Sequence, residues 1–288
     1  MEDRCIITSA SNKFFPSVLN LLGSFKLVYP NHPKIYVYDL GLLKIFRREL
    51  ELINGVEVIK MPEFCKHWRS CYTWKTYIFS HPLANLNFYL DAGCQILRPL
   101  DELFFDINNR GLLLIDQGQC FKKIVPETYK SIFNLNNEFD NETIIHAGII
   151  GFKNSPEIIN IFDKIYKSAI AGLSLGFSPG EMWRNKYKNK NIFIRDCEIF
   201  RHDLTLLNIF FRKTYGKEIK IESLRYYDGI KNIDPKQFIW HLRLSYKSLE
   251  NLDINLLHQN HKLLFIFNRF IVNLLILIKN IYLFFKKN

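Results

Sequence analysis

Residues 88–104 have the sequence FYLDAGCQILRPLDELF, in which an apolar run stops abruptly at Asp91. The run is typical of a buried strand, and the small residues after Asp91 are typical of a tight turn. In open α/β sheets, ligands bind beyond the carboxyl ends of the strands. A carboxylate at such a strand end is suited to bind a divalent cation that bridges phosphate oxygens. The simpler alternative is that Asp91 only caps the turn.

The segments on either side of this stretch alternate between strand and helix patterns. Strands are expected at 5–9, 34–39, 56–60, 87–90, 111–116, 144–152 and 238–244, and helices at 42–52, 73–81, 156–171 and 203–211, with a further helix after Phe14. This alternation predicts an α/β fold with a mostly parallel central sheet. Thr8, Ser9 and Asp39 then stand at carboxyl ends of strands, as Asp91 does.

The pattern changes near His258, so we expect one Rossmann-like domain over residues 1–257 and a helical tail over residues 258–288. Residues 263–285 are almost entirely apolar, and Arg269 and Lys279 interrupt them. At 100° per residue, most of the polar residues fall on one narrow stripe. Charges inside the run argue against a spanning helix and favour an amphipathic helix in the membrane interface. A helix docked on the domain or on a second subunit is the alternative.

The 288 residues include 39 Lys and Arg and 28 Asp and Glu, a net charge of +11, and 48% of them are apolar. This apolar content excludes a disordered chain. The whole excess of positive charge falls in residues 184–231 and 262–288, which suits an anionic membrane surface better than a nucleic acid. The net charge alone would also suit a nucleic-acid-binding protein, but no motif of that class is present, so we expect no nucleic-acid partner.

The six cysteines include no C-x-x-C pair, and the first residues lack a signal-peptide layout. We therefore expect free thiols and a cytoplasmic protein, peripheral on the inner face of the membrane. The pair Cys65 and Cys71 has His67 between its members, but a further ligand is missing nearby, which makes a metal site there improbable. The aromatic residues 68, 72, 74 and 77 have helical spacing, which favours packing over a sugar platform.

Six sequence elements follow one another in a suggestive order. They are Thr8, Ser9, Ala10 and Asn12 after the first strand; Lys75; Leu90-Asp91-Ala92-Gly93; His146-Ala147-Gly148; Asp203-Leu204-Thr205-Leu206-Leu207-Asn208; and His241 with Lys247 six positions later. With these elements the chain resembles glycosyltransferases of the GT-A fold, most closely the family-8 type that includes glycogenin and lipopolysaccharide galactosyltransferases. The resemblance covers roughly residues 5–247.

The resemblance implies a hexosyltransferase that uses a nucleotide sugar, most typically a UDP-sugar, and a glycan or lipid-linked acceptor in lipopolysaccharide or other surface-polysaccharide synthesis. By residue, it implies nucleotide contacts from Thr8, Ser9, Ala10 and Asn12, donor contacts from Lys75 and Lys247, and Mn²⁺ or Mg²⁺ ligands at Asp91 and His241. Asp39 joins the donor-binding candidates because it ends a strand, and a turn role is its alternative. A hydrogen-bonded core histidine is the alternative for His241.

Asp203 is the candidate carboxylate beside the sugar or the acceptor, together with Asp91 in the catalytic set. It would deprotonate the acceptor hydroxyl in an inverting enzyme and hold the donor sugar in a retaining one. Aspartate is also favoured as a helix N-cap, so a capping role is open too.

The chain departs from the family pattern at four positions. Gly93 replaces the second aspartate of the Asp-x-Asp motif, Leu204 a glutamine, Leu244 a glycine and His146 an asparagine. These departures leave metal dependence and stereochemical outcome open. They also motivate an alternative, a catalytically degenerate GT-A-fold binding or scaffold subunit at the membrane.

Overall fold

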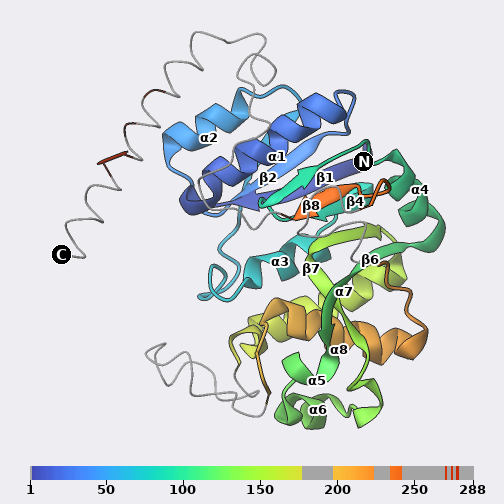
Figure 1. Cartoon of the computed structure of the whole chain (residues 1–288). Helices are drawn as coiled ribbons and strands as arrows, with labels where there is room; N and C mark the ends of the chain where they lie inside the picture. Colours follow the sequence, from blue (N-terminus) through green and yellow to red (C-terminus); the bar gives the residue numbers. More distant parts are fainter. Residues whose placement is uncertain are drawn as a thin grey trace. The chain divides into compact units, whose positions relative to one another are not determined.

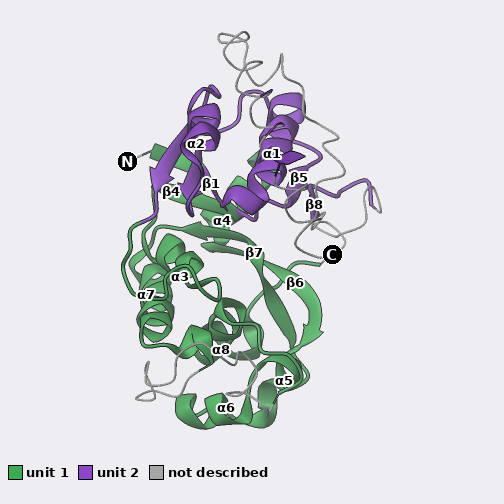
Figure 2. Cartoon of the chain, turned by 90° about the vertical axis from the view of Figure 1, so that its left-hand side faces the viewer, with its two compact units in different colours: residues 1–5, 62–89, 101–227 green, residues 6–61, 90–100, 228–288 purple. Residues whose placement is uncertain are grey.

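The computed structural model describes residues 2–176, 197–223 and 234–241, and four single residues of the tail at 270, 274, 277 and 278. The chain divides into two compact units (Figure 2). Unit 1 comprises residues 1–5, 62–89 and 101–227, and unit 2 comprises residues 6–61, 90–100 and 228–288. The expected domain boundary near His258 lies outside the described residues.

Unit 2 contains the predicted parallel strands (Figure 1). They are β1 (Glu2–Ala10, in this unit from Ile6 on), β2 (Ile35–Asp39) and β3 (Val56–Lys60). β2 pairs in parallel with β1 on one side and with β3 on the other, so that Asp39 lies opposite Ala10 and opposite Lys60. The carboxyl ends of β1 and β2 therefore meet at one edge, as the sequence predicts.

Two helices alternate with these strands, α1 (Phe15–Val28) and α2 (Lys44–Glu51). Phe15 and Phe46 stack with ring centroids 4.2 Å apart, which joins the two helices through a buried contact. α1 also holds β5 (Cys94–Ile96), because the Ser24 hydroxyl accepts a hydrogen bond of 3.1 Å from the Ile96 amide. β5 in turn pairs antiparallel with β8 (Ile239–His241).

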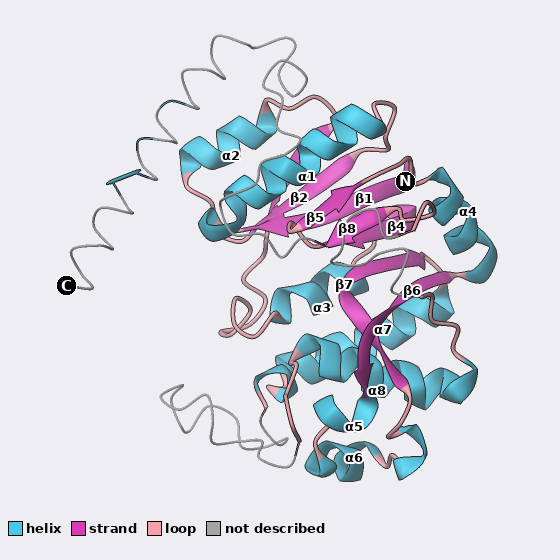
Figure 3. Ribbon diagram, in the orientation of Figure 1, coloured by secondary structure: helices cyan, strands magenta, loops and turns pink. Residues whose placement is uncertain are grey.

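Unit 1 contains β4 (Ala84–Leu90, in this unit up to Tyr89), β7 (Thr143–Lys153) and β6 (Leu112–Cys120), in the order β4-β7-β6. Its longer helices are α3 (Thr73–Ser80), α4 (Asp101–Arg110), α7 (Pro156–Ile170) and α8 (Asp203–Tyr215) (Figure 3). β6 and β7 run antiparallel, and their register shifts on both sides of Asp116. The α/β class with a mostly parallel sheet is thus confirmed, and β6–β7 is an antiparallel pair within that sheet.

The core of unit 1 is aromatic. Phe162 packs against Phe79, Phe152 and Phe211 at centroid distances of 4.9–5.6 Å, which ties α7 to α3, β7 and α8. All four rings are buried. Such packing explains why the helical stripes of these segments are apolar, and burial of each phenylalanine contributes roughly 1.5–3 kcal/mol.

Several short elements escape the sequence patterns. They are α5 (Phe121–Ile124), α6 (Glu127–Phe133) and the 3₁₀ turns η1 (Asn12–Phe14), η2 (Asn137–Phe139), η3 (Leu173–Leu175) and η4 (Gly216–Glu218). Segments of three to seven residues are too short for a 3.6-residue period to show. In α6, the buried Lys130 ammonium bridges Glu127 of the same helix at 2.7 Å and Asp140 beyond it at 2.5 Å, and these ion pairs stabilise the helix.

Within the described part of the chain, no helix has the length and apolar character that crossing a bilayer requires. The four described residues of the tail, Phe270, Leu274, Leu277 and Ile278, are all helical and between 45% and 67% exposed. Their spacing of four, three and one places them on one side of a helix.

Candidate functional site

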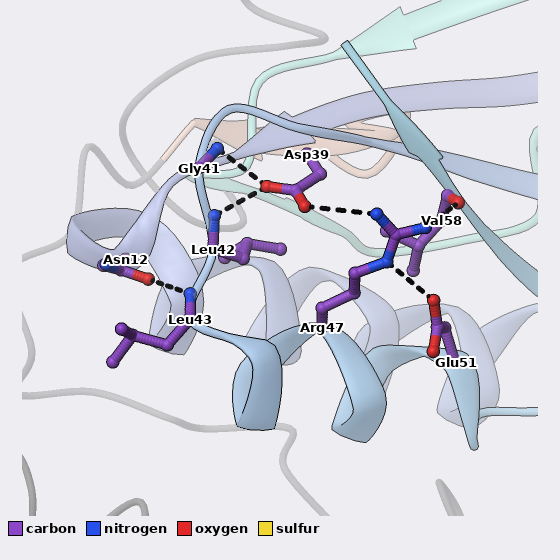
Figure 4. Close-up of polar contacts among 8 residues, drawn as sticks. All are labelled: Asn12, Asp39, Gly41, Leu42, Leu43, Arg47, Glu51 and Val58. Carbon is purple, nitrogen blue, oxygen red and sulfur yellow. Dashed lines mark hydrogen bonds and ion pairs between the residues drawn. The ribbon is translucent and has the colours of Figure 1, made fainter.

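The carboxyl ends of β1 and β2 in unit 2 are joined by side-chain hydrogen bonds (Figure 4). One oxygen of Asp39 accepts from the amides of Gly41 at 2.7 Å and Leu42 at 2.6 Å, and the other lies 3.6 Å from the Arg47 guanidinium. The side-chain oxygen of Asn12 accepts from the Leu43 amide at 2.7 Å. Two of the predicted donor-binding residues, Asn12 and Asp39, therefore fix the backbone of residues 41–43.

This arrangement bears on both interpretations of Asp39. The turn role is present, because the carboxylate binds amides two and three residues further on, as an Asx turn does. Arg47 is itself held by Glu51 at 2.8 Å, so the loop and α2 form one hydrogen-bonded assembly. Donor binding by Asp39 and Asn12 stays a prediction. A donor bound there would contact the loop at residues 41–43, whose shape these two side chains fix.

The other predicted nucleotide contacts lie deeper in unit 2. Thr8 and Ala10 are fully buried and Ser9 is 8% exposed. The Thr8 hydroxyl is buried and has no hydrogen-bond partner among the described residues. A buried hydroxyl that makes no hydrogen bond lowers the stability of the fold, so Thr8 is an unusual position that a bound ligand could satisfy. Nucleotide binding by these three residues stays a prediction.

Asp91 and His241 both lie at one end of the β5–β8 ribbon in unit 2. The Cys94 amide donates to the Asp91 carbonyl at 2.9 Å, which closes the Asp91–Cys94 turn. Cys94 in turn lies opposite His241 in the antiparallel register. The ribbon thus brings together two residues that are 150 positions apart in the sequence, and both are partly exposed.

A carboxylate and an imidazole are suitable in kind as ligands for Mn²⁺ or Mg²⁺, the carboxylate more so for Mg²⁺. They are few in number, since the described residues contain no group of three His, Cys, Asp or Glu that could hold a metal ion. Gly93, at the position of the family's second aspartate, accounts for one missing carboxylate. A cation at Asp91 and His241 would therefore depend on oxygen ligands from the donor and from water.

Lys75 is buried in unit 1 with its ammonium close to strand β7. Its Nζ donates to the Ala147 carbonyl at 3.3 Å and lies 5.4 Å from the ring centroids of both Tyr72 and Tyr89. Cation–π contacts of this kind help to compensate a buried ammonium. Two of the sequence elements, Lys75 and the His146-Ala147-Gly148 strand, are thus in direct contact.

A third element joins them through α8. The side chain of Asn208 accepts a hydrogen bond of 2.8 Å from the Ile145 amide and donates to the Ile145 carbonyl at 3.2 Å, so it fastens α8 to β7. The His146 imidazole accepts from the Gly148 amide at 2.9 Å, which uses the side chain that replaces the family's asparagine. The structure therefore assembles Lys75, residues 146–148 and residues 203–208 within unit 1.

Asp203 is the first residue of α8 and is 5% exposed. The sequence left a capping role open for it, but the N-cap position belongs to His202. A carboxylate in the first helical turn is still favoured by the helix dipole. Its role beside the sugar or the acceptor stays a prediction.

Sequence reasoning passed over His202 and treated Tyr72 as a packing residue. Both have left-handed backbone angles, with φ of 57° and 58°, and their rings lie 6.3 Å apart. Positive φ in bulky residues other than glycine is strained and clusters at functional sites. No signal in the sequence marks such angles, because glycine would be the residue expected there.

The Cys65, His67 and Cys71 group does not form a metal centre among the described residues. The Nε2–H of the buried His67 donates to the Ala169 carbonyl at 2.8 Å, which connects this loop to the end of α7. Burial lowers the pKa of His67, so the ring is neutral near pH 7. Its role here is structural.

The predicted Lys247 and the start of the basic segment 184–231 lie outside the described residues, as does nearly all of the tail. Donor contacts by Lys247 and membrane contacts by the tail stay predictions.

No protein-family model matches the chain, and no curated protein matches it. Among solved structures the chain is similar to the galactosyltransferase LgtC in complex with donor and acceptor sugar analogues, with 16% identity and a TM-score of 0.39 over 57% of this chain and 65% of that one. It is also similar to the bifunctional glycosyltransferase WbbM, with 13% identity and a TM-score of 0.49 over 87% and 44%. A third is GlyE of Streptococcus pneumoniae TIGR4, with 13% identity and a TM-score of 0.48 over 85% and 55%. The chain thus spans about half to two thirds of the length of these glycosyltransferases.

Proposed function

We propose that the chain is a hexosyltransferase that moves a sugar from a nucleotide-diphosphate sugar, with UDP as the preferred nucleotide, to a glycan or a lipid-linked acceptor. The process is surface-polysaccharide or lipooligosaccharide synthesis. The observation that carries this proposal is the contact among three sequence elements in unit 1, where Lys75 binds Ala147 and Asn208 binds Ile145. Lys75 and Ala147 are 72 positions apart in the chain, and their contact is consistent with a site that both elements share.

The donor residues of unit 2 support the proposal independently. Asn12 and Asp39 shape the loop at the carboxyl ends of two parallel strands, where open α/β sheets bind ligands. Asp91 and His241 lie at the same end of the β5–β8 ribbon. When Mn²⁺ or Mg²⁺ is bound, these two side chains would hold it, and the ion would supply positive charge to the diphosphate.

In the transfer step, the bond between the anomeric carbon and the phosphate oxygen breaks, and its electron pair leaves with the nucleoside diphosphate. A bond forms between the anomeric carbon and an acceptor hydroxyl oxygen. In an inverting reaction, Asp203 takes the proton of that hydroxyl, and in a retaining reaction it holds the donor sugar. The Lys75 ammonium contributes positive charge for the leaving phosphate.

The first test is calorimetric titration of the full chain with UDP and with a panel of UDP-sugars, with and without Mn²⁺. We expect binding by the wild type and at least tenfold weaker binding by Asp91→Asn. Asp203→Asn should bind UDP normally and lose sugar transfer. Asp163→Asn, on the surface of α7 and 2.6 Å from Lys167, is the matched control and should behave as wild type. Absence of any nucleotide binding by the wild type would rule out the proposal.

A scaffold subunit is the second candidate, because Gly93 and Leu204 depart from the family pattern and Asp39 already serves a loop. In that case Asp91→Ala and Asp203→Ala would leave the cellular phenotype of the gene intact. Loss of the phenotype in both variants, with normal protein levels, would exclude this candidate.

We further propose that the tail docks the protein on the inner face of an anionic membrane. Residues 262–288 contain five Lys and Arg and no acidic residue. Phe270, Leu274, Leu277 and Ile278 supply an exposed apolar side. Each basic residue near such a surface contributes about 1 kcal/mol.

Sedimentation with vesicles that contain phosphatidylserine tests this docking. We expect binding that weakens with salt, and it should be lost when residues 262–288 are removed and Arg184, Lys186, Lys188 and Lys190 are neutralised. Unchanged vesicle binding by that variant would contradict the proposal, and UDP binding serves as its folding control.

A further inference from the structure

Two loops of unit 1 hold bulky residues in strained backbone conformations next to each other. Cys71 and Tyr72 have φ angles of 53° and 58° immediately before α3. His202 has φ 57° and ψ −114° immediately before α8. Each left-handed residue other than glycine costs on the order of 1–3 kcal/mol unless its surroundings hold it.

The geometry at His202 is that of the second residue of a type II′ turn. The Leu204 amide donates to the Arg201 carbonyl at 3.1 Å, which closes the turn around His202 and Asp203. This position is normally glycine, because φ is positive. The side chain of His202 makes contacts that glycine cannot make, and these contacts offset the strain of the positive φ.

Those contacts join the two loops through η3. The His202 Nδ1–H donates to the Ser174 carbonyl at 2.9 Å. The Ser174 hydroxyl is 2.8 Å from the hydroxyl of Thr73, the residue after Tyr72. Ser174 is fully buried, so one interior residue fixes both strained loops.

The result is one exposed aromatic face with polar groups around it. Tyr72 is 48% exposed, while Trp74 lies 5.3 Å and His202 6.3 Å from its ring. The buried Lys75 ammonium lies 5.4 Å from the centre of the Tyr72 ring, and Asp203 adjoins His202 in the chain. An aromatic face with a few fixed polar groups is typical of small-molecule sites.

We propose that this cluster, Tyr72 with His202, is an acceptor-binding subsite for a saccharide. The exposed face of Tyr72 packs against the C–H groups of one pyranose ring. His202 is a positioning residue that holds Tyr72 and the start of α8, with Asp203, in one arrangement. The inference rests on the proposed glycosyltransferase function and specifies where its acceptor binds.

A saccharide fits this face better than an apolar ligand. The Lys75 ammonium lies 5.4 Å and the His202 ring 6.3 Å from the centre of the Tyr72 ring, and polar neighbours of this kind favour a ligand that itself carries polar groups. A sugar ring instead offers hydroxyl groups to polar neighbours and C–H groups to the aromatic face, and the quadrupole of that face attracts positively polarised hydrogens. The base of a nucleotide could also stack on Tyr72, which the test distinguishes.

The test uses lactose and maltose as probes, each titrated by saturation-transfer NMR, and UDP titrated by calorimetry. We expect wild type and Tyr72→Phe to bind at least one disaccharide with similar affinity, and Tyr72→Ala to bind it at least tenfold more weakly. His202→Gly should also lose at least fivefold. UDP affinity should stay within twofold in all variants. Phe105→Ala, which removes a 66% exposed ring on α4, is the matched control and should change neither ligand.

Equal disaccharide binding by wild type and Tyr72→Ala would overturn the inference, as would binding of neither disaccharide by the wild type. Loss of UDP affinity in Tyr72→Ala would overturn it in favour of base stacking. Failure of the proposed function has a different signature, because then the wild type itself does not bind UDP. If Tyr72→Ala has a lower melting temperature than Tyr72→Phe, Tyr72→Leu supplies a variant that keeps apolar bulk without the aromatic face, and the same criteria apply to it.

Discussion

Asp39 and His202 show at the residue scale how a side chain can override the preference of the backbone around it. Asp39 ends a strand and binds the amides of Gly41 and Leu42, so a carboxylate fixes a loop that begins with a glycine at φ 97°. His202 occupies a position where glycine is favoured and is held there by its bond to Ser174. In both cases the local sequence preference, for aspartate in a turn or for glycine at positive φ, does not predict the contacts that the side chain makes.

The Asp39 loop allows a direct test. Asp39→Ala removes two amide hydrogen bonds and the partner of Arg47, so we expect a loss of about 1–3 kcal/mol in the free energy of unfolding. Asp39→Asn keeps an acceptor oxygen and should lose clearly less. Urea denaturation measures both. Equal losses in the two variants would show that charge, and not hydrogen bonding, stabilises the loop.

The strain at His202 predicts an unusual order of stability. His202→Ala and His202→Gly both lose the ring contacts, but alanine keeps the Cβ that makes positive φ unfavourable. We expect His202→Gly to be more stable than His202→Ala by about 1 kcal/mol, by thermal denaturation. At an ordinary helical position the order is reversed. Ala169, inside α7 and buried, provides that reference: glycine there should be the less stable residue.

At the scale of elements, unit 1 depends on close approach between helix and strand. A Cβ added to Gly151 of β7 would lie 2.6 Å from Ile107 Cγ1 of α4 and 3.0 Å from Leu113 Cβ of β6. This glycine therefore lets α4 pack directly on the β6–β7 pair. Glycine is needed here because it lacks a Cβ and not because of its backbone angles, which are those of an ordinary strand.

We expect Gly151→Ala to lower the free energy of unfolding by about 1–3 kcal/mol through overpacking. Combining it with Ile107→Val should recover part of this loss, because the smaller side chain vacates space beside the new methyl group. Chemical denaturation of the two single variants and the double variant gives the coupling. Strictly additive effects would mean that Ile107 is not the group that obstructs the methyl.

At the scale of the whole molecule, we expect two histidines, the buried His67 and the half-buried His32, to make folding sensitive to acid. His67 bonds to the Ala169 carbonyl in unit 1, and His32 packs at 5.5 Å from Phe25 in unit 2. Burial is the main cause that lowers the pKa of each ring below its usual value near 6.5. The unfolded chain therefore binds protons more readily than the folded one over the range just below that value.

Stability should accordingly fall as the pH drops below about 6.5, because protons then favour the unfolded chain. We expect the melting temperature to decrease between pH 7.5 and pH 5, and His67→Gln to reduce the steepness of that decrease. A melting temperature that rises towards pH 5 would contradict the prediction.

Much of the fold could be predicted because its signals are local. The alternation around β1, β2 and β3 follows from apolar periodicity, and β3 begins and ends at the residues expected. The stop at Asp91 is likewise visible in the sequence. Short elements such as α5 and the antiparallel partner choice of β6 were not predictable, because they depend on contacts with distant segments.

The sequence by itself determined which residue types are available at strand ends: Asn12, Asp39 and Asp91, and the motif around Asp203. Only the tertiary structure decided what surrounds them. The register of β5 and β8 placed His241 opposite Cys94, and Ser174 joined Tyr72 and His202 through a turn where glycine would be expected. The physical reason is that hydrophobic periodicity acts over neighbouring residues, whereas strained backbone angles and strand registers are stabilised by hydrogen bonds between residues far apart in the chain.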